Sequence, residues 1–350
     1  MTLDAAFGPA SAPSGPSPGA PPDPGASGAT YAPARFLPSG HAMTLFAHAA
    51  RGPPGLGPRR ERWDLPDGDF LDVDRHGEDH APTVVILHGL EASSRAPYVL
   101  RLVAAARARS LAALAVNFRG CSGEPNRLRR LYHSGETSDL ARVVERLVAE
   151  RPGRPLALAG FSLGGNVVAK WLGDQGPALP SEVRAGAVLS APFDLACCTE
   201  ALDRARGLAS VYRLHFLRSL RRKALEKLSR FRDLPFDARG VRACRTFAAF
   251  DDLVTARLHG FAGAQDYWER SSARGSLEGL DRPLLALAAE DDPLVPASSL
   301  PLEAGRRNPR FELEVHAQGG HVGFVSGRPW RFTFFAEVRM AAFLDAALRR

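Results

Sequence analysis

Residues 155–172 read PLALAGFSLGGNVVAKWL, in which one serine, Ser162, lies between an apolar run and a helix-like run. Glycines stand two residues before this serine and two residues after it, at Gly160 and Gly164. The spacing G-x-S-x-G is typical of a nucleophile elbow, a sharp turn between a buried strand and a helix. The serine of such a turn adopts an unfavourable backbone conformation, and side chains at the two flanking positions would collide with their surroundings. We therefore predict that Ser162 is a nucleophile at a helix amino terminus, where positive potential favours a developing negative charge.

The alternation of strand and helix patterns extends over most of the chain. Because parallel strands joined by helices form a sheet covered on both faces, this alternation predicts an α/β fold with a mostly parallel, eight-stranded sheet flanked by helices. The expected strands are two within 62–77, joined by a Pro-Asp-Gly turn, and one in each of 83–89, 111–118, 155–160, 185–191, 283–290 and 311–317. The expected helices are 96–110, 136–150, 165–173 and 330–349.

One long segment interrupts this alternation. Residues 195–275 contain no convincing buried strand and have a helical pattern throughout. We interpret the segment as a helical lid over the carboxyl ends of the strands, inserted before the last two strands. The expected core then consists of 35–194 and 276–350, preceded by a tail, 1–34, that is rich in Pro, Ala, Gly and Ser. A tail of this composition cannot bury a core, so we expect it to be disordered.

Composition limits the class of protein. The chain of 350 residues is 45% hydrophobic, carries a formal net charge of +7 and contains four cysteines without metal-ligand spacing. The excess positive charge is almost all arginine, and we interpret it as spread over many faces rather than as a nucleic-acid site. No apolar run approaches the ~18 residues of a membrane-spanning helix, and the start of the chain lacks the pattern of a secretory signal. We expect a cytoplasmic protein that holds no metal.

A serine hydroxyl is a poor nucleophile until a base removes its proton, and in sheets of this type an acid and then the base follow the serine. The stretch AAEDDPLVP (288–296) supplies two carboxylates where a buried strand ends. We favour Asp292 over Asp291, because its distance from Pro296 suits a side chain turned back toward the sheet. Asp292 is therefore the predicted acid.

The base comes from the stretch EVHAQGGHVGF (314–324). His321 follows the last expected strand after a Gln-Gly-Gly loop, which lets its imidazole reach Ser162. His316 lies within the strand, and we rank it well below. His321 is therefore the predicted general base.

Ester chemistry at such a serine also needs two backbone N–H groups that bind the developing oxyanion. One candidate is the amide of Leu163, directly after the nucleophile. The other is the amide of Leu90, in the loop HGLEASS (88–94) that follows an earlier strand. Gly89 would let this loop approach the substrate closely. We predict that Leu90 and Leu163 form the oxyanion hole.

Three other features could have a role. The segment 211–231 combines basic and apolar residues at helical spacing. It could rest on an anionic membrane, but we favour a lid helix with a solvated basic face. The acid pair in FDDLVT (250–255) has the right chain order for a triad, but lies in the lid's return, so we set it aside. His76 and His80 follow a strand, and we interpret them as residues of a surface loop rather than metal ligands.

Taken together, these motifs resemble the YheT-type branch of the α/β-hydrolases. The resemblance implies an α/β-hydrolase fold and a carboxylesterase or acylglycerol lipase without a cofactor, with Ser162, Asp292 and His321 as a charge-relay triad. It also implies short- or medium-chain acyl esters as substrates. The stretches that carry it are GHAMT, RRERWDLPDGDFLDVD, HGLEASS, NFRGCSGEPNRLRRLYHSGETSDL, GFSLGGNVVAKWLG, FDDLVTARLHGFAGAQDYW, AEDDPLVP and GGHVGF.

The sequence thus predicts a lidded serine hydrolase that cleaves carboxylic esters, monoacylglycerols among them, through an acyl-enzyme intermediate. The expected partner is a small acyl ester or lipid, not a nucleic acid. One alternative is acyl transfer to an alcohol. The other is a binding protein that kept the fold and lost turnover.

Overall fold

The computed structural model describes residues 30–350 except 51 and 54, and its centre is one sheet in the order β1-β2-β4-β3-β5-β6-β7-β8. β1 is antiparallel to β2 and β2 to β4, whereas all the other pairs are parallel. The expected mostly parallel, eight-stranded sheet is therefore confirmed. The strands are β1 (Arg59–Asp64), β2 (Phe70–His76), β3 (Thr83–Leu87), β4 (Ala112–Val116), β5 (Leu156–Phe161), β6 (Val183–Leu189), β7 (Leu284–Ala289) and β8 (Phe311–His316).

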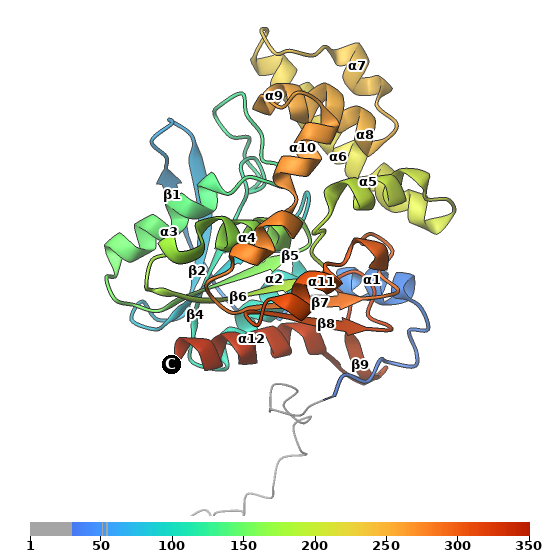
Figure 1. Cartoon of the computed structure of the whole chain (residues 1–350). Coiled ribbons are helices and arrows are strands. Elements are labelled where there is room, and N and C mark those ends of the chain that lie inside the picture. The colour runs from blue at the N-terminus through green and yellow to red at the C-terminus, as the bar shows by residue number, and fades with distance from the viewer. Residues whose placement is uncertain (1–29, 51, 54) are drawn as a thin grey trace, which may run out of the picture.

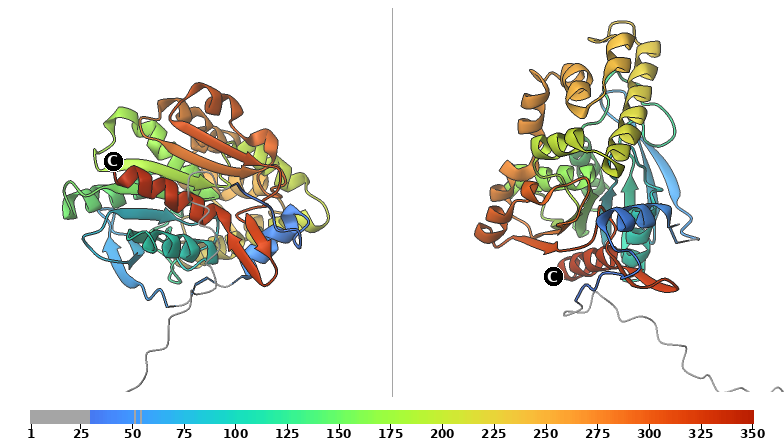
Figure 2. Two further views of the ribbon diagram at one scale, coloured as in Figure 1. Left: turned by 90° about the horizontal axis from the view of Figure 1, so that it is seen from below. Right: turned by 90° about the vertical axis from the view of Figure 1, so that its right-hand side faces the viewer.

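Helices cover both faces of this sheet (Figures 1 and 2). On one face α3 (Ser138–Glu150) and α4 (Leu163–Gln175) share a core with Leu156 and Leu158 of β5. On the other face α2 (Pro97–Arg107) and α12 (Phe335–Leu348) pack around Ala157, Ala159 and Phe161 of the same strand. Because successive strand residues point to opposite faces, a continuous apolar run such as β5 is what a strand buried on both faces requires.

Six α-helices lie between β6 and β7 and gather on one side of the sheet layer, as Figure 1 and the right-hand view of Figure 2 show. They have a core of their own, which includes Leu217, Val241 and Phe250. We call them the lid helices, and the division of the chain into core and lid remains our prediction. They are α5 (Leu195–Arg204), α6 (Leu208–Arg230), α7 (Ala238–Ala243), α8 (Phe247–Phe250), α9 (Arg257–His259) and α10 (Ala264–Ser271), with a π-helix, η2 (Asp251–Ala256), between α8 and α9.

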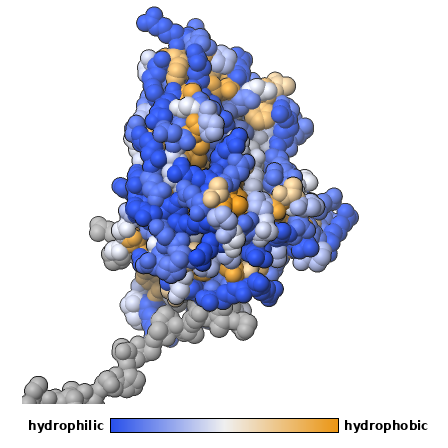
Figure 3. Space-filling view, turned by 90° about the vertical axis from the view of Figure 1, so that its left-hand side faces the viewer, coloured by the Kyte–Doolittle hydropathy of each residue, from blue (hydrophilic) through white to orange (hydrophobic). Residues whose placement is uncertain are grey.

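The surface turned to the viewer in Figure 3 is mainly hydrophilic, with hydrophobic residues scattered over it. Within the described part of the chain, no helix combines the length and apolar character needed to cross a bilayer. The long helix α6 buries Leu217 and Ala224 in the lid core. Contact of its basic face with a membrane remains the alternative that we rank below a solvated face.

Several elements differ from expectation. Helix α1 (Gly40–Ala49) was not predicted. The last helix begins at Phe335 rather than 330, because β9 (Val325–Arg328) and β10 (Arg331–Phe334) pair as a hairpin.

The expected disordered tail is a second difference. Its residues 1–29 lie outside the described part of the chain. Tyr31 and Ala34, however, are only 8% and 1% exposed. The ring of Tyr31 packs against those of Phe324 and Phe335, so the aromatic side chain adds to the core and this end of the tail assignment was wrong.

His76 also differs from its interpretation as a loop residue. It ends β2 and is buried, with Nδ1 placed 3.1 Å from the backbone oxygen of Leu56. Among the residues described, no cluster of three or more His, Cys, Asp or Glu side chains could hold a metal ion.

Candidate active site

Ser162 occupies the turn between β5 and α4 with φ 51° and ψ −123°, a conformation that non-glycine residues rarely adopt. The turn is close-packed on both sides. A Cβ atom on Gly160 would lie 2.3 Å from the backbone oxygen of Gly164, and a Cβ on Gly164 would lie 2.5 Å from that of His88. Both glycines are therefore required by the close approach of neighbouring backbone, as the elbow motif predicts.

The predicted acid and base are in direct contact. Nδ1 of His321 lies 2.9 Å from Oδ2 of Asp292 and 3.1 Å from Oδ1. Oδ1 also accepts the backbone N–H groups of Leu294 at 2.8 Å and Val295 at 3.0 Å, which fixes the carboxylate. The carboxylate can thus orient the ring and stabilise an imidazolium.

The loop that carries His321 is held by side chains on both sides. Oδ1 of Asp291 accepts the N–H groups of Gly319 and Gly320, both at 2.8 Å. Oγ1 of Thr44, in α1, accepts the N–H of His321 at 2.8 Å. Asp291 and α1 therefore have a positioning role, and sequence reasoning missed the part of α1.

The alternative candidates lie elsewhere. The ring of His316 packs edge-on against aromatic rings in the core. Asp251, from the acid pair in the lid, accepts hydrogen bonds from Thr255 and Trp268, and from no histidine in the described part of the chain. Only Asp292 bonds the imidazole of His321 among the carboxylates described.

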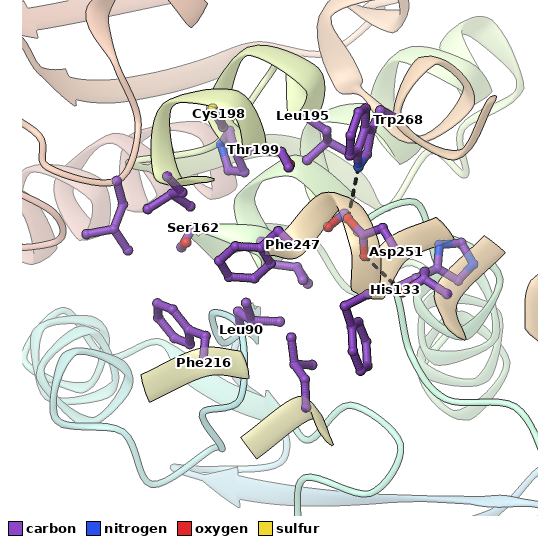
Figure 4. A pocket seen from close by; sticks show the side chains of 18 of the residues that line it. Leu90, His133, Ser162, Leu195, Cys198, Thr199, Phe216, Phe247, Asp251 and Trp268 are labelled. Atoms are coloured by element: carbon purple, nitrogen blue, oxygen red, sulfur yellow. Dashed lines mark hydrogen bonds between the residues drawn. The ribbon is translucent and has the colours of Figure 1, made fainter. Parts of the chain in front are cut away.

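Ser162 and His321 line one cavity, shown in Figure 4. No hydrogen bond joins the two side chains within the described residues; such contacts often tighten only when substrate binds. Leu90 and Leu163 line the same cavity. The lid helices and η2 supply most of its wall: Leu195, Cys198, Thr199, Leu202, Phe216, Leu220, Phe247, Phe250, Asp251, Thr255, Tyr267 and Trp268.

The loop after β3 presents one free amide between two that are bound. The N–H of Gly89 donates to the hydroxyl of Tyr98 at 3.0 Å, and the N–H of Glu91 donates to that of Tyr132 at 2.7 Å. The amide of Leu90 between them donates to no other described residue. This arrangement holds the Leu90 N–H rigidly while leaving it available to an oxyanion.

The imidazole of His88 contacts the same loop. Its Nε2 accepts the N–H of Phe118 at 3.2 Å, so its proton is on Nδ1, which lies 2.7 Å from the backbone oxygen of Gly89. Complete burial lowers the pKa of His88 to about 4. His88 is therefore a neutral structural group and not a second base.

Sequence reasoning also missed a buried ion pair between this loop and the lid. Nζ of Lys223, in α6, lies 2.8 Å from Oε1 of Glu91, and 3.0 Å from the sulfur of Cys121. The hydroxyls of Tyr132 and Ser219 donate to the same carboxylate. Burial acts to raise the pKa of the Glu91 carboxylate, but the neighbouring Lys223 ammonium holds this pKa below its usual value. Glu91 itself has φ 54°, so its backbone is held in a strained conformation next to Leu90.

Comparison with known proteins agrees with this architecture. The sequence profile of the family described as "alpha/beta hydrolase fold" matches residues 82–327. "Putative esterase YheT" of Escherichia coli (strain K12) is 36% identical over 327 residues, which cover 92% of this chain and 95% of that protein. "Monoacylglycerol lipase" of Saccharomyces cerevisiae is 30% identical over 282 residues, covering 78% of this chain but only 61% of the yeast protein. A solved esterase from Pyrococcus furiosus has a TM-score of 0.51 at 18% identity, covering 78% of this chain and 90% of that one, and so shares the fold. This chain belongs to the α/β-hydrolase family.

Proposed function

We propose that this protein is a serine hydrolase that cleaves carboxylic esters of short- and medium-chain acids, acylglycerols among them. The observation that carries the proposal is the contact of the buried Asp292 with His321, which lines one cavity together with Ser162 in its strained elbow. Relatives named as an esterase and a monoacylglycerol lipase support the same class of reaction.

In the proposed mechanism, Nε2 of His321 accepts the hydroxyl proton as Oγ of Ser162 attacks the ester carbonyl. Asp292 stabilises the imidazolium, and the amides of Leu90 and Leu163 bind the oxyanion. The imidazolium then protonates the departing alcohol, which leaves an acyl-serine. Water, activated by the same histidine, releases the acid and regenerates the hydroxyl.

Turnover of p-nitrophenyl butyrate and octanoate tests the proposal. The Ser162→Ala variant should lose activity a thousandfold or more, because the nucleophile is gone. Ser181→Ala is the matched control, since Ser181 is an exposed serine outside the cavity. A Ser162→Ala protein as active as the parent would refute the assignment.

Two alternatives are tested alongside. Acyl transfer to an alcohol would use the same acyl-serine, and the lid helices that wall the cavity could keep water out. Product analysis with and without added alcohol separates transfer from hydrolysis. A binding protein without turnover would release no p-nitrophenol under either condition.

A further inference from the structure

Asp251 is a carboxylate on the cavity wall that the proposed mechanism does not use. It is the first residue of η2, and Figure 4 shows it with Trp268 and His133 on one side of the cavity and Ser162 on the other. π-helical turns within helices are rare and frequently occur at functional sites. The position of Asp251 therefore calls for a role other than the proton relay.

The carboxylate has only two hydrogen-bond donors among the described residues. The hydroxyl of Thr255 donates to Oδ1 at 2.9 Å, and the indole N–H of Trp268 donates to Oδ2, also at 2.9 Å. A carboxylate can accept about four hydrogen bonds. Asp251 therefore keeps acceptor capacity that nothing in the described part of the chain fills.

No cation compensates this charge within the residues described. Asp251 forms no ion pair there, and the charge that acts on its pKa is that of another carboxylate, Asp203, which raises it. Burial is the main cause that raises the pKa of Asp251 to about 6. Retaining an unpaired carboxylate in a largely apolar cavity is unfavourable for folding, which is typical of a group kept for binding.

The chemistry of the neighbouring groups indicates what would bind. Thr255 uses its only proton on Asp251, and Trp268 uses its indole proton in the same way. The carboxylate of Asp251 therefore keeps free acceptor positions that suit a hydrogen-bond donor of the substrate. The remaining wall, with Leu195, Phe216 and Leu294, suits an acyl chain, which has no donor to offer.

We propose that Asp251 binds a free hydroxyl of the alcohol portion of the substrate, so that the cavity selects esters of polyols. This inference rests on the proposed ester hydrolysis and adds the residue that recognises the alcohol portion of the substrate. We choose a hydroxyl over an ammonium group, because the cost of desolvating a buried ion pair commonly exceeds the attraction between its two charges.

The test compares two esters of one acid, 1-octanoylglycerol and methyl octanoate, on the parent and on the Asp251→Asn variant. Asparagine keeps the shape and an oxygen that can accept the Trp268 proton. We expect the ratio of kcat/KM for the glycerol ester to that for the methyl ester to fall about tenfold, the worth of one hydrogen bond to a charged group. Any loss of folded enzyme affects both esters equally and cancels in this ratio.

Asp252→Asn is the matched control, since Asp252 is the exposed neighbour in the same turn, and it should leave the ratio unchanged. An unchanged ratio in Asp251→Asn would overturn the inference and assign the carboxylate to lid structure. A third ester, of octanoate with ethanolamine, distinguishes the donor; a drop confined to it would overturn the choice of a hydroxyl. If the parent hydrolyses none of these esters, the proposed function itself has failed.

Discussion

Replacing Lys223 with methionine would remove the ion pair by which the lid helix α6 holds the loop after β3. The pair is buried: the side chain of Glu91 is 3% exposed and that of Lys223 is 12% exposed. Leu90, which we propose as an oxyanion donor, is the residue directly before Glu91. The variant therefore asks whether the lid fixes the geometry of the reacting site.

The size of the effect follows from the contact distance and burial. Two unit charges 2.8 Å apart attract by ~6 kcal/mol at an effective dielectric constant of about 20, most of which offsets the cost of burying them. Loss of one partner from a buried pair costs about 3–5 kcal/mol. Since Glu91 keeps the hydroxyl donors of Ser219 and Tyr132, we expect the lower end, about 3 kcal/mol.

The expected kinetic change is smaller than the complete loss of an oxyanion donor, which costs about 10²–10³ in kcat. We expect Lys223→Met to lower kcat about tenfold with little change in KM, because the Leu90 amide moves but remains present. Urea unfolding gives the stability, and octanoate ester turnover gives the kinetic constants. Arg222→Met is the control, because it removes one positive charge from an exposed position of the same helix.

A double-mutant cycle that combines Lys223→Met with Glu91→Gln tests the coupling between the lid and the loop. Removing both charges should recover at least half of the stability lost in Lys223→Met, since no unpaired charge remains buried. If the effects of the two single substitutions simply add, or if Lys223→Met equals the parent in stability and kcat, the coupling between lid and loop is absent.

Three further predictions concern the elbow, the triad and the loop beneath the site. Gly164→Ala places a Cβ 2.5 Å from the backbone oxygen of His88 and should lower the free energy of unfolding by about 1–3 kcal/mol or more. Gly275→Ala is the control, because its Cβ would meet nothing within 4 Å; equal urea midpoints for the two variants would contradict the prediction. Asp292→Asn should lower kcat about 10³–10⁴-fold by removing the charge that orients His321, and a variant within tenfold of the parent in ester turnover would exclude that role. In the unfolded chain the imidazole of residue 88 becomes protonated below pH 6.5, whereas folded His88 stays neutral down to pH about 4. The free energy of unfolding should therefore fall by up to ~3 kcal/mol as the pH is lowered across that range. If this free energy depends on pH in the same way in the parent and in His88→Gln, the prediction is wrong.

The sheet and the elbow could be predicted because their signals are local. A strand buried on both faces needs a continuous apolar run, and β5 has one directly before Ser162. The choice of Asp292 over Asp291 also followed from local spacing, and the structure places Asp292 on the imidazole of His321. Residues at strand ends meet at one edge of a parallel sheet, which made their convergence predictable.

The hairpin of β9 and β10 was missed because its strand signal lies directly beside a strong helix signal. Residues 330–334 alternate apolar and polar side chains, which is a strand pattern, but they run directly into α12, so assigning all of 330–349 to one helix missed the hairpin of β9 and β10. The turn between these strands contains Pro329, a signal that could have marked the hairpin.

Contacts between residues far apart in the chain could not be predicted from the sequence. Glu91 and Lys223 are 132 residues apart, and no spacing rule joins a loop of the core to a helix of the lid. Asp251 was recognised as a candidate acid, but its place on the cavity wall depends on how the lid helices pack. Packing between elements, not propensity within them, decides both contacts.

Covalent labelling tests the central claim most directly. A fluorophosphonate reacts only with a serine whose hydroxyl proton a neighbouring base can accept, so it reports the relay itself and not merely the fold. We predict one adduct per chain, located by peptide mass spectrometry on Ser162 and absent from Ser162→Ala. A folded protein that takes up no label, or takes it up on another serine, would contradict the account.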